Sequence, residues 1–306
     1  MNNFIEIRVD EETAGERLDS FVSSQFTEFS RSKIQKLIKE EKILLNNKKA
    51  KVATILKECD IVAFDKPDGT LTIQPQNIEL DVRFEDDDML VVNKPKNMLT
   101  HPTVLETENT LVNALLFKYG KSLSDLNGEM RPGIVHRLDR NTSGLLMIAK
   151  NNNSHSLLAE KIKQKTAKRN YLAVVSGNLD FETKTISAPI GRNPSNPAKM
   201  AVIEGGKPSV THVKVLERFK GYTYVELELE TGRTHQIRVH LSHIGHPIVN
   251  DTFYGGKQLG VKTTEQVLQA YQLTFNRLND NILTTITLEP DEDVKRVLNY
   301  LRSKKG

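Results

Sequence analysis

A short apolar run directly behind a charged loop is the feature that most limits how this chain can fold. Residues 144–149, Gly-Leu-Leu-Met-Ile-Ala, are continuously apolar, which is typical of a buried strand, although periodicity alone also fits a buried helical segment. The loop in front of the run places Asp139 between Arg137 and Arg140. The sequence therefore presents one carboxylate between two guanidinium groups at the start of a buried element.

Periodicity elsewhere predicts a mixture of strands and helices. Residues 224–230, Tyr-Val-Glu-Leu-Glu-Leu-Glu, alternate apolar and acidic side chains, as a strand with one solvated face does. Residues 151–165 have helical periodicity, and Val294, Leu298 and Leu301 follow the i, i+4, i+7 spacing of another helix. The order lacks the regular βαβ alternation of a parallel fold. We therefore expect an α+β fold in which helices flank a large mixed or antiparallel sheet.

The first 65 residues predict a small module of two helices and a hairpin. Capping-box spacing occurs twice, at 13–16 and at 32–35, ahead of apolar residues at helical spacing. An Asn-Asn-Lys-Lys turn at 46–49 separates two short strands. The expected strands are 42–45, 51–53 and 61–64.

The composition changes after this module. Pro67, Gly69 and Pro75 interrupt a stretch without clear period, which is typical of a linker. We therefore expect three parts: a small N-terminal α/β domain at 1–66, a linker at 67–80 and the main domain at 81–306.

Positive charge is concentrated in the N-terminal module. Between Arg31 and Lys51 the sequence has eight Lys and Arg residues against Glu40 and Glu41, whereas the whole chain has a formal net charge of only +4. A basic segment on a nearly neutral body indicates a surface that binds a polyanion. A solvated helix face followed by a Lys-rich turn would give the same composition.

The cysteine content and the start of the chain favour a cytoplasmic protein. Cys59 is the only cysteine, so the chain can form neither an internal disulfide nor a metal site with several thiolates. The N-terminus has no basic and apolar leader, and the chain has no apolar run of the roughly 18 residues that a membrane span needs. We expect a cytoplasmic location without a membrane partner.

A second polar stretch follows the alternating strand. The segment 230–247 turns at Gly232 and continues into a predicted helix capped by Thr234, so that Arg233 is the first cation on the turn. Four histidines occur here, at positions 235, 240, 243 and 246. They raise the alternative of a metal site, but no acidic residue with metal-ligand spacing lies near them in the sequence, and we expect no metal.

Asp139 and Tyr171 each have a structural interpretation beside the functional one. A loop aspartate commonly caps a turn by accepting backbone N–H bonds, and a lone tyrosine in an apolar segment is more often part of the core. Two neighbouring arginines would instead keep the Asp139 carboxylate ionised and nucleophilic.

Two motifs taken together identify a resemblance. HRLDRNTSG at 136–144 and TGRTHQIRVHL at 231–241 are similar to the two signature motifs of RluA-type pseudouridine synthases, and shorter matching pieces lie before, between and after them. The sequence from Gly15 resembles the S4 RNA-binding domain, in which a helix pair and a β-turn present cations to folded RNA. The resemblance thus covers the chain from Val82 to about Gly256, together with an S4-like N-terminal domain.

The resemblance implies that the protein isomerises uridine to pseudouridine within an RNA chain, without a metal or an organic cofactor. Asp139 takes the position of the family's catalytic aspartate, which acts as the nucleophile, and Arg233 matches the arginine that pairs with it. Tyr171 matches the tyrosine that stacks on the target base. Arg137 stands where related enzymes insert an arginine into the RNA stack as the target nucleotide leaves.

The resemblance also implies an RNA partner. Arg31, Lys33 and Lys36 fall in the S4-like part and are the expected RNA contacts. An S4-like domain favours large-subunit, 23S-type ribosomal RNA or its assembly precursor over tRNA, and we expect a monomer. Three other hypotheses remain: a tRNA-directed synthase, an RNA-binding ribosome-assembly factor with dispensable catalysis, and a metal-dependent hydrolase that would use the histidines.

Some details stay open or depart from the family pattern. His136 and Thr142 belong to the first motif, and we assign them scaffold roles. Where relatives usually carry a glycine, this chain has Lys96-Asn97-Met98, and the turn is expected to survive because Asn tolerates left-handed backbone angles. The sequence does not decide whether Asp139 attacks the sugar, attacks the base ring or removes a sugar proton.

Overall fold

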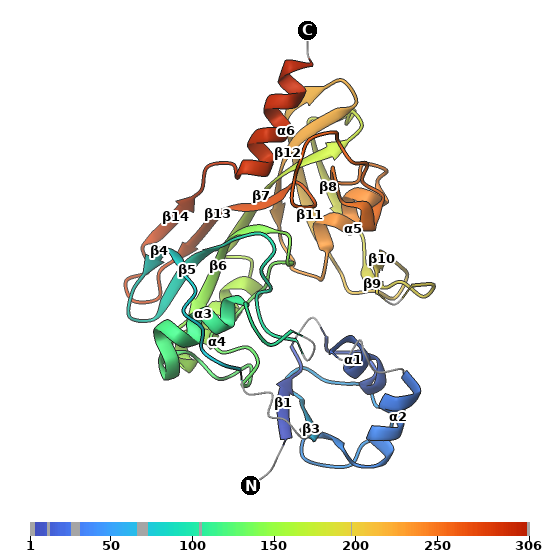
Figure 1. The fold of residues 1–306 in the computed structure, drawn as a ribbon, viewed down its shortest axis with the longest axis vertical. Helices are drawn as coiled ribbons and strands as arrows, with labels where there is room; N and C mark the ends of the chain where they lie inside the picture. The colour runs from blue at the N-terminus through green and yellow to red at the C-terminus, as the bar shows by residue number, and fades with distance from the viewer. Residues whose placement is uncertain are drawn as a thin grey trace. The chain divides into compact units, whose positions relative to one another are not determined.

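The computed structural model describes residues 4–10, 13–25, 31–65, 73–103, 106–196 and 198–304 (Figure 1). These residues separate into two compact units. One unit contains the described residues of 1–80, 99–135 and 148–155, and the other contains those of 81–98, 136–147 and 156–306.

The N-terminal unit has a small antiparallel sheet and a helix pair. The sheet has the strand order β1-β3-β2, and helices α1 and α2 contact each other. The elements are β1 (Phe4–Arg8), α1 (Leu18–Gln25), α2 (Arg31–Lys39), β2 (Ile43–Leu45), β3 (Ile61–Asp65), α3 (Leu111–Tyr119) and the 3-10 helix η1 (Gly120–Ser122).

The core of this unit is built from the apolar residues whose spacing predicted the two helices. The apolar residues of α1 and α2 that are at most 1% exposed are Leu18, Phe21, Val22, Ile34 and Ile38. They form one cluster with strand residues and with Met130, which comes from the later part of the unit. The two predicted helices are therefore confirmed, and burial of their apolar faces is what stabilises them.

The predicted hairpin is wrong. The strand β2 pairs with β3, and residues 51–53 form no strand. The turn at Asn46 and Asn47 is present, with φ angles of 50° and 59°, but directly after it Lys48 pairs with Leu45 only as an isolated bridge. The sequence also gave no indication of β1, the strand that completes this sheet.

The start of α1 explains why residues 51–53 are not a strand. The helix begins at Leu18, and the amides of Leu18 and Asp19 donate to the carbonyls of Thr54 and Val52 at 2.8 and 3.2 Å. Free amides at a helix N-terminus need such acceptors. The carbonyls that a strand would use thus serve the helix, and Thr13, which lies in the preceding turn, is not its cap.

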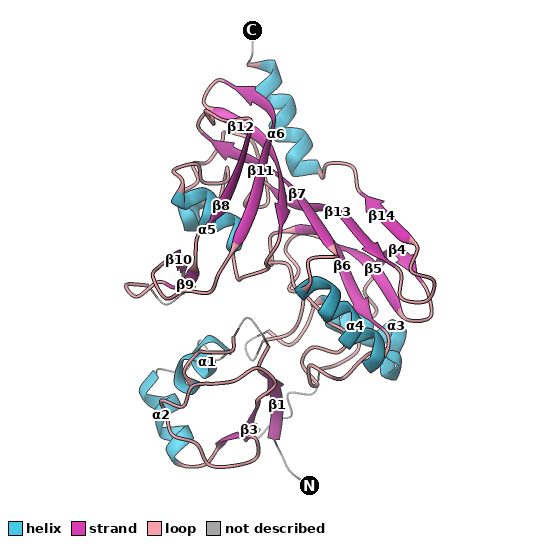
Figure 2. Ribbon diagram, turned by 180° about the vertical axis from the view of Figure 1, so that it is seen from behind, coloured by secondary structure: helices cyan, strands magenta, loops and turns pink. Residues whose placement is uncertain are grey.

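The second unit is organised around a nine-stranded sheet. The strand order is β4-β5-β6-β13-β7-β12-β11-β8, with β14 paired to β13. Only the pair β6 and β13 is parallel among the pairings of this sheet whose direction is described. Figure 2 shows these strands lying side by side through the unit. The predicted fold class, α+β with a large mixed sheet, is confirmed.

The elements of this part of the chain are as follows. The strands are β4 (Asp81–Glu85), β5 (Met89–Lys94), β6 (Ser143–Ala149), β7 (Lys168–Ser176), β8 (Thr183–Ser187), β9 (Ile190–Arg192), β10 (Met200–Val202), β11 (Val210–Phe219), β12 (Tyr222–Leu229), β13 (Leu268–Asn276) and β14 (Leu283–Thr287). The helices are α4 (Asn152–Lys163), α5 (Gln236–His243), the 3-10 helix η2 (Thr252–Tyr254) and α6 (Glu292–Ser303). The predicted helices at 151–165 and at the C-terminus are confirmed.

The apolar run at 144–149 is strand β6, and all of its residues are buried. Gly144 has a φ of 121°, and a Cβ atom there would lie 2.0 Å from the carbonyl oxygen of Ala270, its register partner on β13. Only glycine allows this backbone approach. The buried-strand interpretation is therefore confirmed, and the helical alternative is wrong.

The predicted linker lies partly outside the described residues. Residues 67–72 lie outside the described part of the chain, and residues 73–80 form neither helix nor strand. The limits 1–66, 67–80 and 81–306 remain a prediction. None of the helices in the described part of the chain is long and apolar enough to span a membrane.

Candidate active site

Asp139 lies in the loop that leads into β6. The amide of Thr142 donates to the Asp139 carbonyl at 3.1 Å, which closes a turn just before the strand begins. The Asp139 side chain is 19% exposed. The nucleophile candidate is thus presented from the end of a fully buried strand, which holds it in one place better than a long loop would.

Lys94 fixes the same loop from the neighbouring strand. Its side chain is fully buried at the end of β5, and Nζ donates to the carbonyls of Pro95 and Met98 at 2.8 Å and to that of Arg140 at 3.1 Å. Burial lowers the pKa of Lys94 to about 7. Three acceptors match the three donors of an ammonium group, so Lys94 ties the residue after Asp139 to the β5 end.

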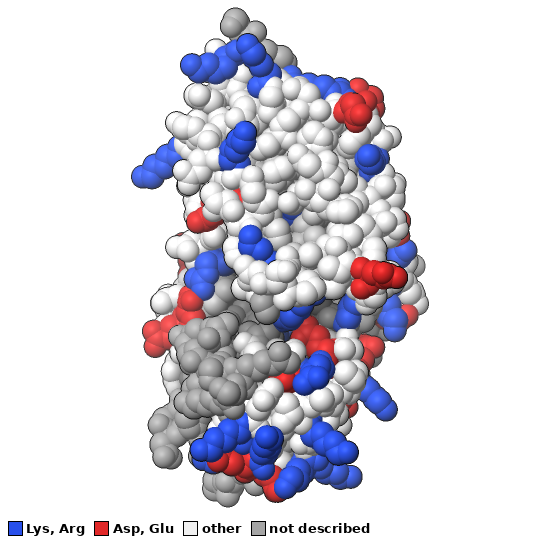
Figure 3. All heavy atoms as spheres, turned by 90° about the vertical axis from the view of Figure 1, so that its right-hand side faces the viewer, with Lys and Arg blue, Asp and Glu red and all other residues white. Residues whose placement is uncertain are grey.

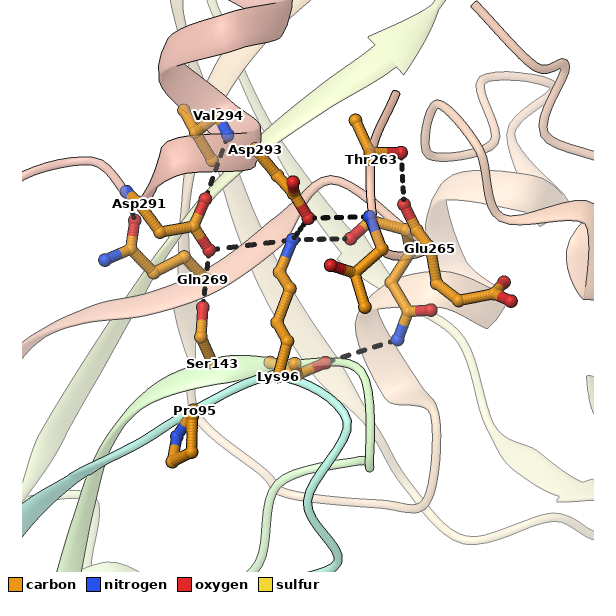
Figure 4. Close-up of polar contacts among 12 residues, drawn as sticks. Pro95, Lys96, Ser143, Thr263, Glu265, Gln269, Asp291, Asp293 and Val294 are labelled. Atoms are coloured by element: carbon orange, nitrogen blue, oxygen red, sulfur yellow. Dashed lines mark hydrogen bonds and ion pairs between the residues drawn. The ribbon is translucent and has the colours of Figure 1, made fainter. Parts of the chain in front are cut away.

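A second set of polar contacts holds the start of β6. Ser143 donates to Asp291 at 2.6 Å, and Lys96 lies 2.8 Å from Asp293 and 3.5 Å from Asp291 (Figure 4). Both aspartates stand at the beginning of α6, where negative charge is favourable. The adjacent Asn97 has a φ of 60°, so the left-handed turn expected at this position is present.

His136 supports the loop as a neutral group. Its Nε2 accepts the amide hydrogen of Met147 at 3.0 Å, so the ring bridges the loop and β6. Burial lowers the pKa of His136 to about 3. This geometry agrees with a scaffold role, and Thr142 likewise accepts a bond, at 3.4 Å, from Gln266.

The arginine that pairs with Asp139 is Arg238. Its Nη1 lies 3.0 Å from Asp139 Oδ2, while Nε and Nη2 bind the two oxygens of Asp251 at 2.7 and 2.9 Å. Arg238 and Asp251 are buried. Although burial acts to lower it, the bonds to the two carboxylates raise the pKa of Arg238. The guanidinium therefore stays charged between two carboxylates.

The predicted pairing of Arg233 with Asp139 is therefore wrong. Arg233 precedes α5, and its Nε makes a long contact of 3.5 Å with the carbonyl of Pro208. Arg238 lies inside the helix, one residue after the buried Ile237. The two arginines stand five residues apart in the same motif, so sequence spacing alone did not separate them. Recognising Asp251 as a carboxylate partner of Arg238 would have distinguished Arg238 from Arg233.

The charges around Asp139 keep it ionised. Burial acts to raise its pKa, but His235, Arg238 and Arg137 lower it, and the net result is a pKa below the usual value of an aspartate. An ionised carboxylate is required of a nucleophile. The site thus meets the first chemical condition for the role that the resemblance implies.

His235 packs edge-on against Phe253 and Tyr254 beside the Asp139–Arg238 pair. The sequence did not predict this aromatic group. The φ of His235, 57°, is left-handed, and His235 caps α5 without a side-chain bond, so the predicted Thr234 cap is wrong. Its Nδ1 is 2.8 Å from the Tyr254 hydroxyl, and its Nε2 is 3.8 Å from Asp139. The Tyr254 ring lies 4.9 Å from the Arg238 guanidinium, at cation–π distance.

Tyr171 and Arg137 differ in their exposure. Tyr171 lies on β7 and is 5% exposed. Burial and the Asp139 charge raise the pKa of Tyr171 while Arg169 opposes them, so the phenol lies within electrostatic reach of both residues and stays protonated. Arg137 is exposed. Their roles toward a target nucleotide remain predictions.

Two further histidines of this stretch, His240 and His246, are engaged in protein contacts, whereas His243 is exposed. His240 is fully buried, with Nδ1 2.9 Å from the Thr211 hydroxyl and Nε2 3.0 Å from the Ala188 carbonyl. His246 Nδ1 is 2.9 Å from the Ser176 carbonyl. The described part of the chain contains no group of three or more His, Cys, Asp or Glu side chains that could hold a metal ion.

The three predicted RNA contacts of the N-terminal unit lie on α2. The side chains of Arg31 and Lys33 are outside the described part of the structure. Lys36 is exposed, with its Nζ 3.6 Å from Glu40. In the space-filling view, basic side chains gather over the N-terminal elements with acidic ones among them (Figure 3). These positions remain predicted contacts.

Two family models match the chain. Residues 88–243 match the model described as RNA pseudouridylate synthase, and residues 16–62 match the S4 domain. The first match contains both signature motifs, with Asp139 and Arg238, and ends before Asp251.

Curated relatives extend this similarity to nearly the whole chain. A Bacillus subtilis (strain 168) protein described as an uncharacterized RNA pseudouridine synthase is 40% identical over 301 residues, covering 98% of this chain and 99% of the relative. Ribosomal large subunit pseudouridine synthase D of Neisseria meningitidis serogroup B is 38% identical, covering 99% of this chain and 83% of the relative. The synthase D of Escherichia coli O6:H1 is 37% identical over 88% of this chain and 82% of its own.

Solved structures give the same fold. Human RNA pseudouridylate synthase domain containing 1 superposes with a TM-score of 0.54 at 25% identity, covering 78% of this chain and 98% of that one. Human RNA pseudouridylate synthase domain containing 4 superposes with a TM-score of 0.57 at 21% identity, covering 72% and 92%. The second likeness concerns the fold alone.

Proposed function

Because the chain belongs to the RNA pseudouridine synthase family, and is thus an isomerase that acts on RNA, we propose that Asp139 is its nucleophile and that large-subunit ribosomal RNA is its substrate. The observation that carries the first part is the 3.0 Å contact between Asp139 and Arg238, with Arg238 held by Asp251 on its other side. This arrangement keeps a half-buried carboxylate ionised and oriented.

The reaction requires the target uridine to leave the RNA stack. A uracil within folded RNA presents neither its sugar carbon nor its ring carbons to a side chain, so the nucleotide must be extruded at a cost of a few kcal/mol. The exposed Arg137 is two residues from Asp139 and is free of the buried ion pair, which suits it to fill the gap left by the extruded base.

Tyr171 is proposed to contact the extruded base. Its phenol lies within electrostatic reach of Asp139, and its ring is fixed in the middle of β7. A rigid aromatic ring offers a stacking face for a uracil. Its raised pKa keeps the hydroxyl protonated, so the hydroxyl is available as a hydrogen-bond donor during the rearrangement.

The substrate and the remaining assignments rest on the relatives and on the S4 match. Relatives at 37–38% identity are named ribosomal large subunit pseudouridine synthase D, which supports ribosomal RNA over tRNA. We propose an S4-like RNA-binding domain at 1–66, a linker at 67–80 and a catalytic domain at 81–306, supported by the matched ranges 16–62 and 88–243. A cytoplasmic monomer without a cofactor fits this substrate.

Mapping pseudouridine in total RNA tests the proposal. Cells that lack the gene are compared with cells rescued by the wild type or by Asp139→Asn, which removes one charge and almost no volume. We expect specific uridines of large-subunit RNA to lose the modification and only the wild type to restore it. Restoration by Asp139→Asn would refute the nucleophile, and loss confined to tRNA would refute the substrate.

A further inference from the structure

Arg169 is a buried cation outside the Asp139 pair. It lies on β7, two residues before Tyr171, and is 5% exposed. Its Nε is fully buried without a hydrogen-bond partner, and within the described part of the chain no ion pair to its guanidinium is found. Buried polar groups in native proteins almost always have partners, so this one calls for an explanation.

The surroundings of Arg169 offer it little compensation. Its register partners on the two neighbouring strands are Leu229 and Leu273, both apolar and buried. On another side the guanidinium packs against the turn at Gly232, where a Cβ atom would lie 2.7 Å from Nη1. A guanidinium stays protonated even when it is buried, so the site carries an uncompensated positive charge.

Arg169 lies near Tyr171, the residue proposed to contact the target base: the two are two residues apart on β7 and interact electrostatically. Burial has the largest effect and lowers the pKa of Arg169; Tyr171 raises it, and Arg233 lowers it further. Arg169 and Asp139 both act electrostatically on the Tyr171 phenol, Arg169 by lowering its pKa and Asp139 by raising it. Asp139 forms its ion pair with Arg238, and Arg238 also binds Asp251. Neither carboxylate therefore pairs with Arg169.

We propose that Arg169 binds a phosphate oxygen of the target nucleotide beside Tyr171. The inference rests on the proposed function, because it requires an extruded nucleotide at this site. A guanidinium matches a phosphate in both charge and fork geometry. A uracil carbonyl would accept a hydrogen bond but would leave the charge uncompensated. The absence of a Cβ at Gly232 leaves Nη1 the room that it occupies.

A volume-conserving change of Arg169 separates binding from structure. Arg169→Met removes a buried charge that no carboxylate compensates, so the unfolding temperature of the full chain should stay the same or rise. Affinity for the RNA, measured on the Asp139→Asn background so that no turnover is needed, should fall by about 10- to 100-fold, the range for a hydrogen bond to a charged group. Arg169→Lys should recover part of this loss.

Changing the RNA identifies the bound oxygen. The probe is a synthetic RNA that contains the mapped uridine, with a neutral methylphosphonate in place of one flanking phosphate. At one of the two flanking positions, the methylphosphonate should weaken RNA binding by the protein that retains Arg169. The same methylphosphonate should not change RNA binding by the Arg169→Met variant. Equal losses in both proteins would overturn the proposal. A loss that follows 4-thiouridine substitution of the base, and not the methylphosphonate, would overturn it in favour of a base carbonyl.

Gly232→Ala gives a second test that leaves the arginine in place. The added Cβ would displace Nη1 at the flexible end of a side chain, so folding should be little affected. It should weaken RNA binding in the wild type and have no further effect on Arg169→Met. A fall in unfolding temperature with unchanged RNA affinity in Arg169→Met would show that the residue is structural and would overturn the proposal.

The two proposals can fail separately. If mapping finds no modified uridine, the proposed function fails, and inorganic phosphate replaces the RNA as the probe. Phosphate should then raise the unfolding temperature of the wild type more than that of Arg169→Met, because a ligand stabilises the state that binds it. Equal shifts in the two proteins would overturn the phosphate site.

Discussion

The charged side chains around Asp139 are largely buried and paired, whereas those described in the basic segment on α2 and β2 are exposed to solvent. Arg238 is 10% exposed at its side chain and lies between two carboxylates, whereas the Lys36–Glu40 pair has side chains 74% and 42% exposed. Buried pairs keep their strength because little water screens them, and exposed pairs contribute little. We infer that the first region supplies orientation for chemistry and the second supplies attraction for RNA.

Removing Arg238 should have the largest effect on both stability and turnover. Arg238→Met leaves Asp139 and Asp251 without their shared partner, which should cost about 3–5 kcal/mol of unfolding free energy. Turnover should fall by about 10²- to 10³-fold, as for the loss of one preorganised charge at a reaction centre. Urea unfolding and single-turnover pseudouridine formation measure the two effects.

A control for Arg238 comes from an exposed ion pair. Arg302 lies 2.8 Å from Glu217 with a side chain 51% exposed. Arg302→Met should change the unfolding free energy by no more than about 0.5 kcal/mol. Comparable losses in the two variants would contradict the distinction between buried and exposed pairs. If Arg238→Met does not fold, Arg238→Lys tests the loss of the two-sided geometry alone.

His136 and His155 allow the acid stability of the two units to be compared, because the pKa of each is lowered in the folded protein. Burial lowers the pKa of His136 to about 3 and that of His155, in the N-terminal unit, to about 4. An unfolded histidine has a pKa near 6.5, so the unfolded state binds more protons below that pH and the unfolding free energy falls as the pH falls. The contribution is fully present above pH 6.5.

Substitution of His136 should therefore flatten the acid dependence. At roughly 1.4 kcal/mol per pKa unit, His136→Gln should remove about 3–5 kcal/mol of the change between pH 6.5 and 3. The smaller shift of His155 predicts a smaller effect for His155→Gln, ending near pH 4. Urea unfolding across this range measures both, with the exposed His243→Gln as control. An unchanged slope in His136→Gln would contradict its neutral state.

Asp251→Asn should give an intermediate effect. The amide keeps one acceptor for Arg238 but loses the charge and one of the two bonds, so Asp139 should be oriented less firmly. We expect turnover to fall about tenfold with little change in RNA affinity, since one charged hydrogen bond contributes about 1.5–3 kcal/mol. Single-turnover rates at saturating RNA test this. A loss confined to RNA affinity would contradict a positioning role.

Neutralising Lys36 should give the smallest effect and sharpen the comparison from the other side. Lys36→Gln should weaken RNA binding a few-fold and lower the slope of log affinity against log salt by about 0.7–0.9, the value for one phosphate contact. Turnover at saturating RNA should not change. The matched control is Lys295→Gln on α6, an exposed lysine in a similar ion pair, 3.7 Å from Glu292. If the slope of log affinity against log salt is the same in both variants, Lys36 does not contact the RNA.

The sequence predicted local structure best where burial imposes a period. The run at 144–149, the C-terminal helix and the helices α1 and α2 all followed their apolar patterns. Pairing of distant segments left no such pattern. The carbonyls of residues 52 and 54 act as caps for α1, and nothing local in the sequence distinguishes that use from a β-ladder.

The sequence identified Asp139 as a site residue but did not identify the residues that contact it. Asp139 could be assigned from its motif, whereas Arg233 and Arg238 share one motif and differ only in which faces the carboxylate. That choice depends on the left-handed His235, which starts α5 later than the predicted Thr234 cap would. Asp251 and the unpaired Arg169 become visible only when the chain is folded.

Single-turnover conversion of the mapped RNA by Asp139→Asn tests the central claim most directly. The account predicts no detectable pseudouridine, while RNA affinity stays within about threefold of the wild type because the change alters one charge and almost no volume. Product formation by Asp139→Asn at a rate near that of the wild type would contradict the claim that the carboxylate held by Arg238 is the nucleophile.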